Sequence, residues 1–379
     1  MPFILLGLVV LVGLFGGFLP YELKSFLYAI SLTVKSFIIF VLPFIIFGLL
    51  FKTSSEMVQK ATRMIFVILG AICVSNFVTS IVGGYIGTIV YDLEFDIVRP
   101  AENIKLMAPS FDFSLPKLLP NDKAMLLALI LGALAGKFVP TFARQISSKF
   151  ESVIKLILKL IKITIPFFVI GFLVKMQYEG LVLTILENYA LIFLAIALVA
   201  FVYVSAYYFI ASGFIFSKLL TSIKNMLPAC IVGFSTMSSA ASMPLMIDGS
   251  ARNSENPNLA KSVIPISVNF HLIGCSISIP IFVFAILKNF GFAEPTLISY
   301  LIFACYFVIA KFSVAGVPGG GILVMLPIIE SCFGFNSDML SLITALYILF
   351  DPIITTCNIL GNGALAMLLS NSKPRNQLK

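Results

Sequence analysis

Long apolar stretches, separated by short polar turns, dominate the chain. Several reach about 20 residues, the length that an α-helix needs to cross roughly 30 Å of hydrocarbon. They are continuous rather than alternately apolar and polar, which excludes an outer-membrane β-barrel. The pattern predicts an all-α polytopic membrane protein of about eight transmembrane helices, at residues 3–19, 26–51, 64–90, 123–139, 153–175, 181–215, 263–287 and 339–369.

The composition agrees with this class. Of the 379 residues, 60% are hydrophobic and 11% are charged, whereas about a quarter of the residues in a soluble protein are charged. The six cysteines occur singly and there is one histidine, which argues against a disulfide framework, a Cys/His metal site or a cofactor. We attribute the net charge of +8 to membrane topology rather than to nucleic-acid binding.

The distribution of charge predicts the orientation. Segment 91–113 is mainly acidic and is expected outside the cytoplasm, whereas the turns at 52–63 and 137–149 and the tail at 372–379 are basic. The positive-inside rule then places both termini in the cytoplasm, as for a protein of the bacterial inner membrane. The first apolar stretch lacks the basic start and the cleavage site of a signal peptide, so we expect it to be retained as a helix.

Two apolar segments, within 224–248 and 300–330, are interrupted in the middle by Ser, Gly and Pro. Such interruptions survive at membrane depth only where they line a cavity or are buried in protein, so we expect two re-entrant hairpins. Each is followed by a helix with a polar centre, at 268–275 and 351–362. Paired interrupted segments indicate a midplane binding site in a secondary transporter. Small residues that only let helices pack closely are the alternative.

Three motifs in this order resemble one family. FSTMSSAASMP (234–244) and AGVPGGGI (315–322) are similar to the two hairpin tips of the dicarboxylate/amino acid:cation symporters, the glutamate transporter family. DPIITTCNILGN (351–362) is similar to the substrate-binding stretch of their last helix, and the likeness extends to FIIFVLPFIIFGLLF in the second helix. The resemblance implies a homotrimer of eight-helix protomers, in which a transport domain moves against a static scaffold.

The resemblance also implies a division of the chain. Residues 1–220 would form mainly scaffold and trimerisation helices, with a contribution of the third helix to the transport domain. The transport-domain core would comprise residues 221–371, followed by a cytoplasmic tail at 372–379. Within the core we expect a first hairpin at 224–250, a seventh helix at 260–287, a second hairpin at 296–332 and an eighth helix at 338–370.

Asp351 is the first candidate substrate ligand, because an ionisable group deep in a membrane helix is costly and usually functional. Its position matches the family's aspartate that holds the substrate ammonium; a helix N-cap before Pro352 is the alternative. Asn358 lies two turns further on the same face and matches the asparagine that contacts the substrate's α-carboxylate. Thr355, one turn from Asp351, is a further polar contact.

The hairpin tips supply the other candidates. At Ser238 and Ser239, hydroxyls and N–H groups at a helix start would attract a carboxylate, unless these small residues only pack the hairpin. The second tip would serve as the extracellular gate, since its glycines permit hinge-like opening. Its candidate substrate contacts are Val317 and Gly319, and its candidate gate residues are Gly316, Pro318, Gly320 and Gly321.

The chain also departs from the family pattern. Ile354 and Met237 stand where the family carries an arginine for a side-chain carboxylate. Without that bidentate partner, a neutral amino acid, or another small molecule with an amine and one carboxylate, fits better than an acidic one.

The family's sodium ligands are altered as well. The family's Asn-Met-Asp-Gly-Thr motif reads His-Leu-Ile-Gly-Cys at 271–275, and its late aspartate is an asparagine. Hard cations prefer oxygen ligands, and carboxylates where charge must be neutralised, so the standard multi-sodium site is weakened and no metal ligand is certain. The candidate cation-coupling residues are Thr79, Ser80, Asn269, His271, Lys311, Asn358 and Asn362.

Two of these residues carry their own hypotheses. His271 titrates near neutrality when unperturbed and is a candidate proton-coupling site, or else a hydrogen-bonded packing residue. Lys311 lies inside the second hairpin, where a fixed ammonium takes the electrostatic role of a lost cation, or else extends to the interface. Thr79 and Ser80 match oxygen ligands of the family and are equally explained as satisfied helix hydroxyls.

We therefore predict a secondary active symporter that imports a small amino acid or dicarboxylate, coupled to H+ or Na+, by an elevator-type mechanism. The expected partners are the substrate, the bilayer and further copies of the chain. An uncoupled channel is the alternative. An intramembrane enzyme built on Ser235 and His271 is remote, because no GxSG context surrounds the serine.

Overall fold

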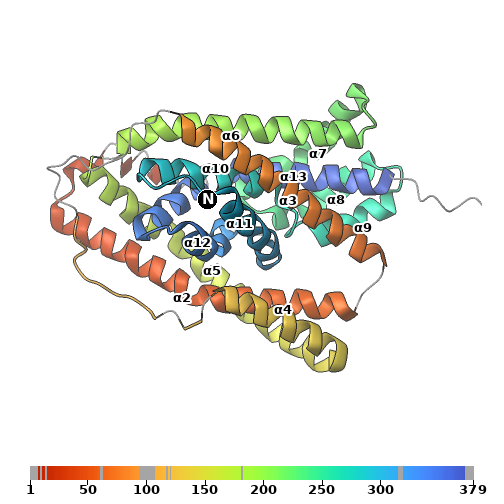
Figure 1. Ribbon diagram of the computed structural model, residues 1–379, viewed down its shortest axis with the longest axis horizontal. Helices are drawn as coiled ribbons and strands as arrows, with labels where there is room; N and C mark the ends of the chain where they lie inside the picture. The colour runs from red at the N-terminus through yellow and green to blue at the C-terminus, as the bar shows by residue number, and fades with distance from the viewer. Residues whose placement is uncertain are drawn as a thin grey trace, which may run out of the picture.

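A computed structural model describes residues 7–8, 11–12, 15–59, 63–93, 107–116, 118–119, 121–180, 182–314 and 319–371. Every regular element in these ranges is helical, which confirms the all-α class for the described part of the chain. Most helices run along the long axis of the molecule, and a short 3-10 turn, η1 (Gly16–Phe18), precedes the first long helix (Figure 1).

Five described helices are long and apolar enough to cross a membrane. They are α2 (Tyr21–Gln59), α3 (Arg63–Asp92), α5 (Pro140–Tyr178), α6 (Val182–Ala211) and α13 (Ser337–Asn371). The crossing expected at 123–139 corresponds to the shorter α4 (Asn121–Phe138), which packs along α2 (Figure 1). The one expected at 3–19 lies partly outside the described residues.

The first interrupted segment folds as a helical hairpin of α7 (Phe216–Thr236) and α8 (Ser239–Asn253). At its tip, Met237 adopts a left-handed conformation with φ 54°, and the chain then turns through the extended Ser238. The Ser238 side chain caps α8 by accepting a hydrogen bond from the Ala241 N–H at 3.3 Å. The hairpin is longer than the expected 224–250, and α7 begins inside the range assigned to the scaffold.

The expected seventh helix is wrong as a single helix. It consists of α9 (Pro257–Ser267) and α10 (Ile273–Asn289), separated by a non-helical stretch at 268–272. Neither glycine nor proline lies within that stretch, so local propensity does not explain the interruption. Side chains from other helices bind its released backbone groups instead, as shown below.

The second hairpin consists of α11 (Leu297–Ala310), the 3-10 turn η2 (Lys311–Ser313) and α12 (Gly320–Phe333). Its outermost tip, residues 315–318, lies outside the described residues. Gly319 precedes α12 with φ 70°, a conformation that side chains rarely tolerate. The positions of both arms agree with the expected range 296–332.

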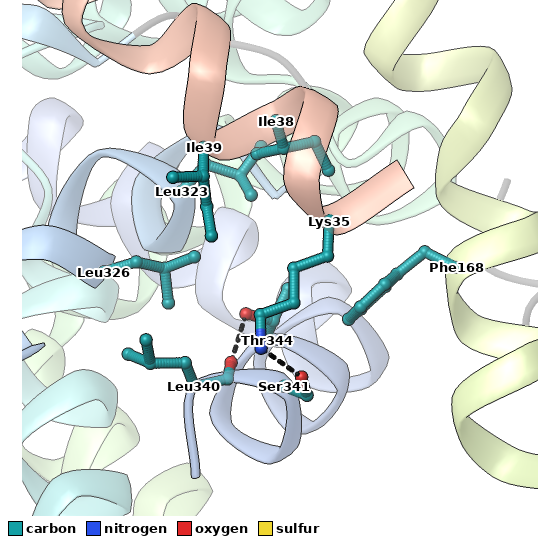
Figure 2. A pocket seen from close by; sticks show the side chains of 9 residues that line it. All are labelled: Lys35, Ile38, Ile39, Phe168, Leu323, Leu326, Leu340, Ser341 and Thr344. Atoms are coloured by element: carbon teal, nitrogen blue, oxygen red, sulfur yellow. Dashed lines mark hydrogen bonds between the residues drawn. The ribbon is translucent and has the colours of Figure 1, made fainter. Parts of the chain in front are cut away.

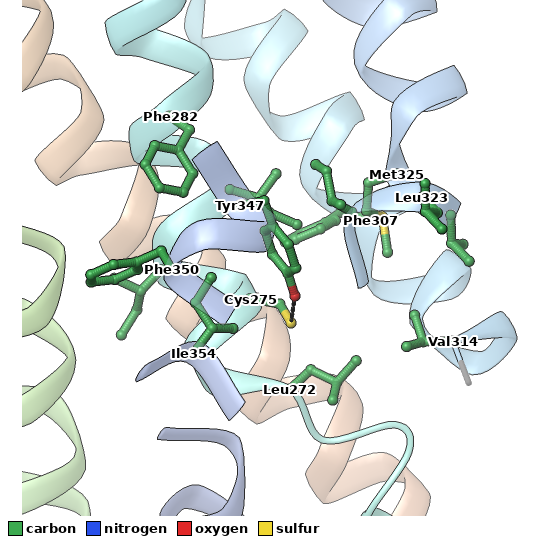
Figure 3. Close-up of a cluster of buried hydrophobic side chains, with 14 of the residues drawn as sticks. Leu272, Cys275, Phe282, Phe307, Val314, Leu323, Met325, Tyr347, Phe350 and Ile354 are labelled. Carbon is green, nitrogen blue, oxygen red and sulfur yellow. Dashed lines mark hydrogen bonds between the residues drawn. The ribbon is translucent and has the colours of Figure 1, made fainter. Parts of the chain in front are cut away.

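The core surrounds α10 and α13. Every residue of α10 from Ile273 to Leu287 is buried, and aromatic and aliphatic side chains of α10 to α13 pack around it (Figure 3). Gly274 allows the close approach of α10 to α13, because a Cβ there would lie 3.1 Å from the Cβ of Cys357. Outer helices such as α6 instead leave large apolar side chains exposed, as a surface in lipid requires.

Candidate substrate and cation site

The first hairpin tip, Val314 and Gly321 of the second hairpin, the α9–α10 interruption and the helices α10 and α13 line one small cavity. Its volume is about 30 Å³, which is enough to hold water. The lining residues are Met237, Ser239, Val268, Asn269, Leu272, Cys275, Val314, Gly321, Tyr347, Asp351, Thr355 and Asn358.

Among the described lining residues of this cavity, only Asp351 is charged. It lies inside the continuous α13, so it is not a helix N-cap. Its Oδ2 accepts a hydrogen bond from the Gly319 N–H at 2.8 Å, and its Oδ1 accepts one from the Thr355 hydroxyl at 3.2 Å. The carboxylate therefore holds the second hairpin against α13.

Asn358 lies two turns further along α13 and contacts the same cavity. Its Oδ1 accepts a hydrogen bond from the Gly274 N–H at 2.8 Å, which fixes the start of α10. Its Nδ2 lies 3.5 Å from the Cys275 sulfur, and sulfur is a weak acceptor. The amide is thus anchored through its oxygen, while its N–H groups are available for a stronger acceptor.

Cys275 and Tyr347 are cavity residues that the sequence reasoning missed. The Cys275 thiol lies 2.9 Å from the Tyr347 hydroxyl, and Figure 3 shows the two groups pointing toward one another between α10 and α13. Tyr347 precedes Asp351 by one helical turn, so it shares the face that carries Asp351 and Asn358. From that spacing, Tyr347 could have been predicted to line the cavity.

The hairpin residues divide into two sets. Ser239 and Gly321 line the cavity, and Gly319 reaches it through its hydrogen bond to Asp351. Ser238 caps α8 and Gly320 begins α12, but neither lines the cavity. The remaining predicted tip residues, Gly316, Val317 and Pro318, lie outside the described residues.

Several candidate cation ligands lie away from the cavity. The Thr79 hydroxyl lies 2.6 Å from the Ser75 carbonyl oxygen and 2.8 Å from the Tyr203 hydroxyl. The Ser80 carbonyl accepts a hydrogen bond from the Tyr300 hydroxyl. Neither residue lines the cavity.

Asn269 and His271 lie in the α9–α10 interruption. Asn269 lines the cavity, and its Oδ1 has no hydrogen-bond partner among the described residues. His271 is fully buried behind the lining, with Nε2 2.8 Å from the Ser75 hydroxyl and its ring against Tyr207. The Ser235 hydroxyl donates to the Ile231 carbonyl, so within the described residues it forms no hydrogen-bonded dyad with His271.

Lys311 and Asn362 both bind the interruption from outside. The Lys311 ammonium is fully buried rather than extended to an interface, and it contacts α3, α10 and the interruption itself. The Asn362 amide donates hydrogen bonds to the His271 carbonyl at 2.9 Å and to the Asn358 carbonyl at 2.7 Å. Lys311 thus joins the interruption and the start of α10 to α3, whereas Asn362 joins the interruption to α13.

Comparison with known proteins identifies the family. The family model described as the sodium:dicarboxylate symporter family matches residues 1–372 of the chain. The chain belongs to this family.

Relatives of known name are matched over a shorter stretch. The serine/threonine transporter SstT of Acinetobacter baumannii (strain SDF) is 29% identical over 109 residues, which is 29% of this chain and 27% of that protein. SstT of Acinetobacter baylyi (strain ATCC 33305 / BD413 / ADP1) is 29% identical over 118 residues, which is 31% of this chain and 29% of that protein. The matched stretch thus covers less than a third of either relative.

Membership of the symporter family implies a coupling cation. Sodium would need several oxygen ligands, with carboxylates to balance its charge. No group of three or more His, Cys, Asp or Glu side chains within the described ranges is placed to hold a metal ion. The His271 and Leu272 carbonyls instead accept hydrogen bonds from Asn362 and Lys311. The buried amide oxygens of Asn269 and Asn362 have no hydrogen-bond partner among the described residues, but they carry no charge. The site thus lacks the carboxylates that would balance the sodium that the family name implies.

A larger cavity of about 490 Å³ adjoins the small one. Asn269 and Val314 line both cavities. The other walls of the larger cavity come from α2, α3, α5, α8 and the residues before α10, and Lys52 and Glu151 form an ion pair of 2.6 Å on its α2–α5 side.

Proposed function

We propose that this protein is a secondary active symporter that imports a small amino acid, with a neutral side chain favoured over a dicarboxylate. Import is coupled to a gradient of H+ or Na+ and proceeds by an elevator-type movement. The proposal takes its general class from the symporter family. It takes its substrate from the chemistry of the small cavity.

The observation that carries the proposal is Asp351 in the cavity lining. A buried carboxylate is the group that an ammonium needs in a dry site. The described lining contains no lysine or arginine, so a second carboxylate on the substrate would find no cation there. One amine and one carboxylate, with a short side chain, match this arrangement best.

The substrate carboxylate has its own candidate partners. Ser239 begins α8 at the first tip, and N–H groups at a helix start attract an anion. The Asn358 amide makes only a weak contact with a thiol, so a carboxylate competes well for its N–H groups. Together these groups hold the end of an amino acid opposite the ammonium.

Two groups of helices support the elevator part of the proposal. α2 packs chiefly against α4 and α5, whereas α10 and α13 pack with α3, α7 and each other. Polar contacts bridge the groups at one end: Figure 2 shows Lys35 of α2 reaching Ser341 of α13 at 2.9 Å. Lys175 of α5 pairs with Asp338 at 3.0 Å. A sliding movement would break these bridges.

The proposed assembly follows the family resemblance. It is a homotrimer in the bacterial inner membrane, with both termini in the cytoplasm and no nucleic-acid partner. Single cysteines introduced near either terminus of a variant lacking its six native cysteines would test the orientation, because a membrane-impermeant thiol reagent labels only groups outside sealed cells.

Uptake into proteoliposomes tests the proposed activity. Labelled serine, threonine, alanine, aspartate and succinate are offered under an inward H+ gradient, an inward Na+ gradient, or no gradient. We expect serine-sized neutral amino acids to accumulate under one cation gradient, with aspartate and succinate taken up at least about 10-fold less.

Two outcomes would contradict the proposal. Flux that follows the substrate gradient alone, with no accumulation, would identify an uncoupled channel. Accumulation of aspartate or succinate in preference to neutral amino acids would overturn the assignment of the cavity, because it requires a cation that the described lining lacks.

A further inference from the structure

The interruption between α9 and α10 releases backbone polar groups at the centre of the helix bundle. Residues 268–272 are non-helical. The N–H groups of Val268, Phe270 and His271 still bond to backbone carbonyls, whereas the Phe270 and His271 carbonyls and the Leu272 N–H bond to side chains. Hydrocarbon cannot satisfy such groups. Their partners must be side chains, water or bound ions.

Asn76 of α3 satisfies two of these groups. Its Nδ2 donates a hydrogen bond to the Phe270 carbonyl at 2.7 Å, and its Oδ1 accepts one from the Leu272 N–H at 3.1 Å. Asn76 is fully buried. It therefore ties both sides of the turn to α3.

Lys311 lies beside the Leu272 carbonyl, which also accepts the Ser276 N–H at 3.0 Å and the Ser276 hydroxyl at 2.9 Å. Its ammonium donates to the Ser276 hydroxyl, to Asn76 Oδ1 at 3.3 Å and to the Leu272 carbonyl at 3.5 Å. It also lies 4.3 Å from the centre of the Phe307 ring, whose face attracts cations. No carboxylate within the described residues forms an ion pair with it.

The groups around the Lys311 ammonium are those that a bound monovalent cation would have. One backbone carbonyl, one amide oxygen and one hydroxyl converge on a single positive charge. These are the neutral oxygen donors that a hard cation takes in proteins. Here the cation is part of the chain and cannot dissociate.

Asn362 of α13 binds a further carbonyl of the interruption. Its amide donates to the His271 carbonyl and to the Asn358 carbonyl. N–H donors of the chain thus bind both the His271 and the Leu272 carbonyls. Neither oxygen needs an external ion.

The bound ammonium is close to the substrate cavity. Leu272 lines the cavity and accepts from Lys311 through its carbonyl, and Ser276 follows the cavity residue Cys275. The ammonium thus places a positive charge behind the cavity wall. A bound sodium ion would supply the same charge.

We propose that Lys311 is a resident cation that takes the place of bound sodium at the α9–α10 interruption, so that an amino acid binds at Asp351 without Na+. The inference rests on the proposed function. The proposed function allowed H+ or Na+ as the coupling ion, and this inference selects H+.

Binding of labelled serine to the purified protein, in NaCl or in choline chloride of equal ionic strength, tests the inference directly. We expect dissociation constants that agree within about 3-fold, since the tethered charge is present in both salts. Serine binding that is at least about 10-fold weaker in choline chloride would overturn the inference and leave the proposed function intact. Failure of the whole amino-acid panel to bind in either salt would instead refute the proposed function.

Variants of Lys311 identify the charge as the cause. Lys311→Ala leaves three oxygens around a vacated space, so serine binding in choline chloride should weaken by at least about 10-fold and recover with added Na+ or methylammonium. Lys311→Gln retains N–H donors for those oxygens but no charge, and should weaken binding without recovery. It also keeps the test valid if the alanine variant does not fold.

Lys288→Ala is the matched control. Lys288 belongs to α10, and its ammonium lies 4.8 Å from the centre of the Tyr91 ring, away from the interruption. Its substitution should leave serine binding unchanged in both salts. Normal binding by Lys311→Ala or Lys311→Gln in choline chloride would overturn the inference.

Discussion

The α9–α10 interruption and the tip of the second hairpin both release backbone groups near the same cavity, but they are satisfied in different ways. At the interruption, the partners are Asn76, Lys311 and Asn362, none of which lines the cavity. At the hairpin tip, the Gly319 N–H bonds to Asp351, which does line it. The first set of bonds is internal, whereas the second uses the carboxylate to which we assign the substrate ammonium.

This difference separates a fixed part of the site from an exchangeable part. A ligand cannot reach the bonds at the interruption without displacing the cavity wall. In the proposed function, in contrast, a substrate ammonium would compete with the Gly319 N–H for the Asp351 carboxylate. We therefore expect substrate binding to alter the second hairpin and to leave the interruption unchanged.

Asp351→Asn should have the largest effect on binding. An asparagine oxygen still accepts from the Gly319 N–H, so the hairpin contact remains, but the charge that pairs with the substrate ammonium is lost. Removing one member of a buried, hydrogen-bonded charge pair costs about 3 kcal/mol, which predicts a loss of serine affinity of more than about 100-fold. Binding of labelled serine measures it.

Asp338→Asn is the matched control for this substitution. Asp338 lies on the same helix but outside the cavity, where it pairs with Lys175 and is half-exposed. Its partner Lys175 is buried but keeps a second carboxylate, Glu179, at 3.7 Å, so serine binding should be unchanged. If Asp351→Asn bound serine as well as Asp338→Asn, the ammonium would not pair with Asp351.

The exchangeable part of the site was largely predictable from the sequence. Ser, Gly and Pro interrupt two apolar segments, and this local signal indicates both hairpins. Asp351, Thr355 and Asn358 recur at helical spacing on one face, and all three line the cavity. These inferences depended on residues close together in the chain.

The fixed part was not predictable in the same way. Residues 268–272 contain no glycine or proline, so a continuous helix was the natural expectation. The bonds that stabilise the interruption come from Asn76, 194 residues from Phe270, and from Asn362, 91 residues from His271. Only the tertiary structure brings these partners together.

Asn76→Leu should have the second-largest effect. It should lower the stability of the protein rather than remove a contact with the substrate. It leaves the Phe270 carbonyl and the Leu272 N–H buried without partners, at about 1–2 kcal/mol for each group. We expect the free energy of unfolding to fall by about 2–4 kcal/mol in the absence of substrate, measured by denaturant titration in detergent. The exposed Asn258→Leu on α9 controls for the loss of an asparagine, and equal destabilisation by both variants would refute the role of Asn76.

Ser238→Ala should have the smallest effect and tests whether the first tip belongs to the fixed or to the exchangeable part. Ser238 caps α8 but does not line the cavity, unlike Ser239. Loss of an N-cap costs about 1 kcal/mol, so unfolding should become easier by that amount while serine affinity changes by less than about 5-fold. Ser238→Asn should restore the stability, because asparagine caps as well as serine. A large loss of affinity that Ser238→Asn does not restore would instead place the Ser238 hydroxyl in direct contact with the substrate, and the first tip would then belong to the exchangeable part of the site.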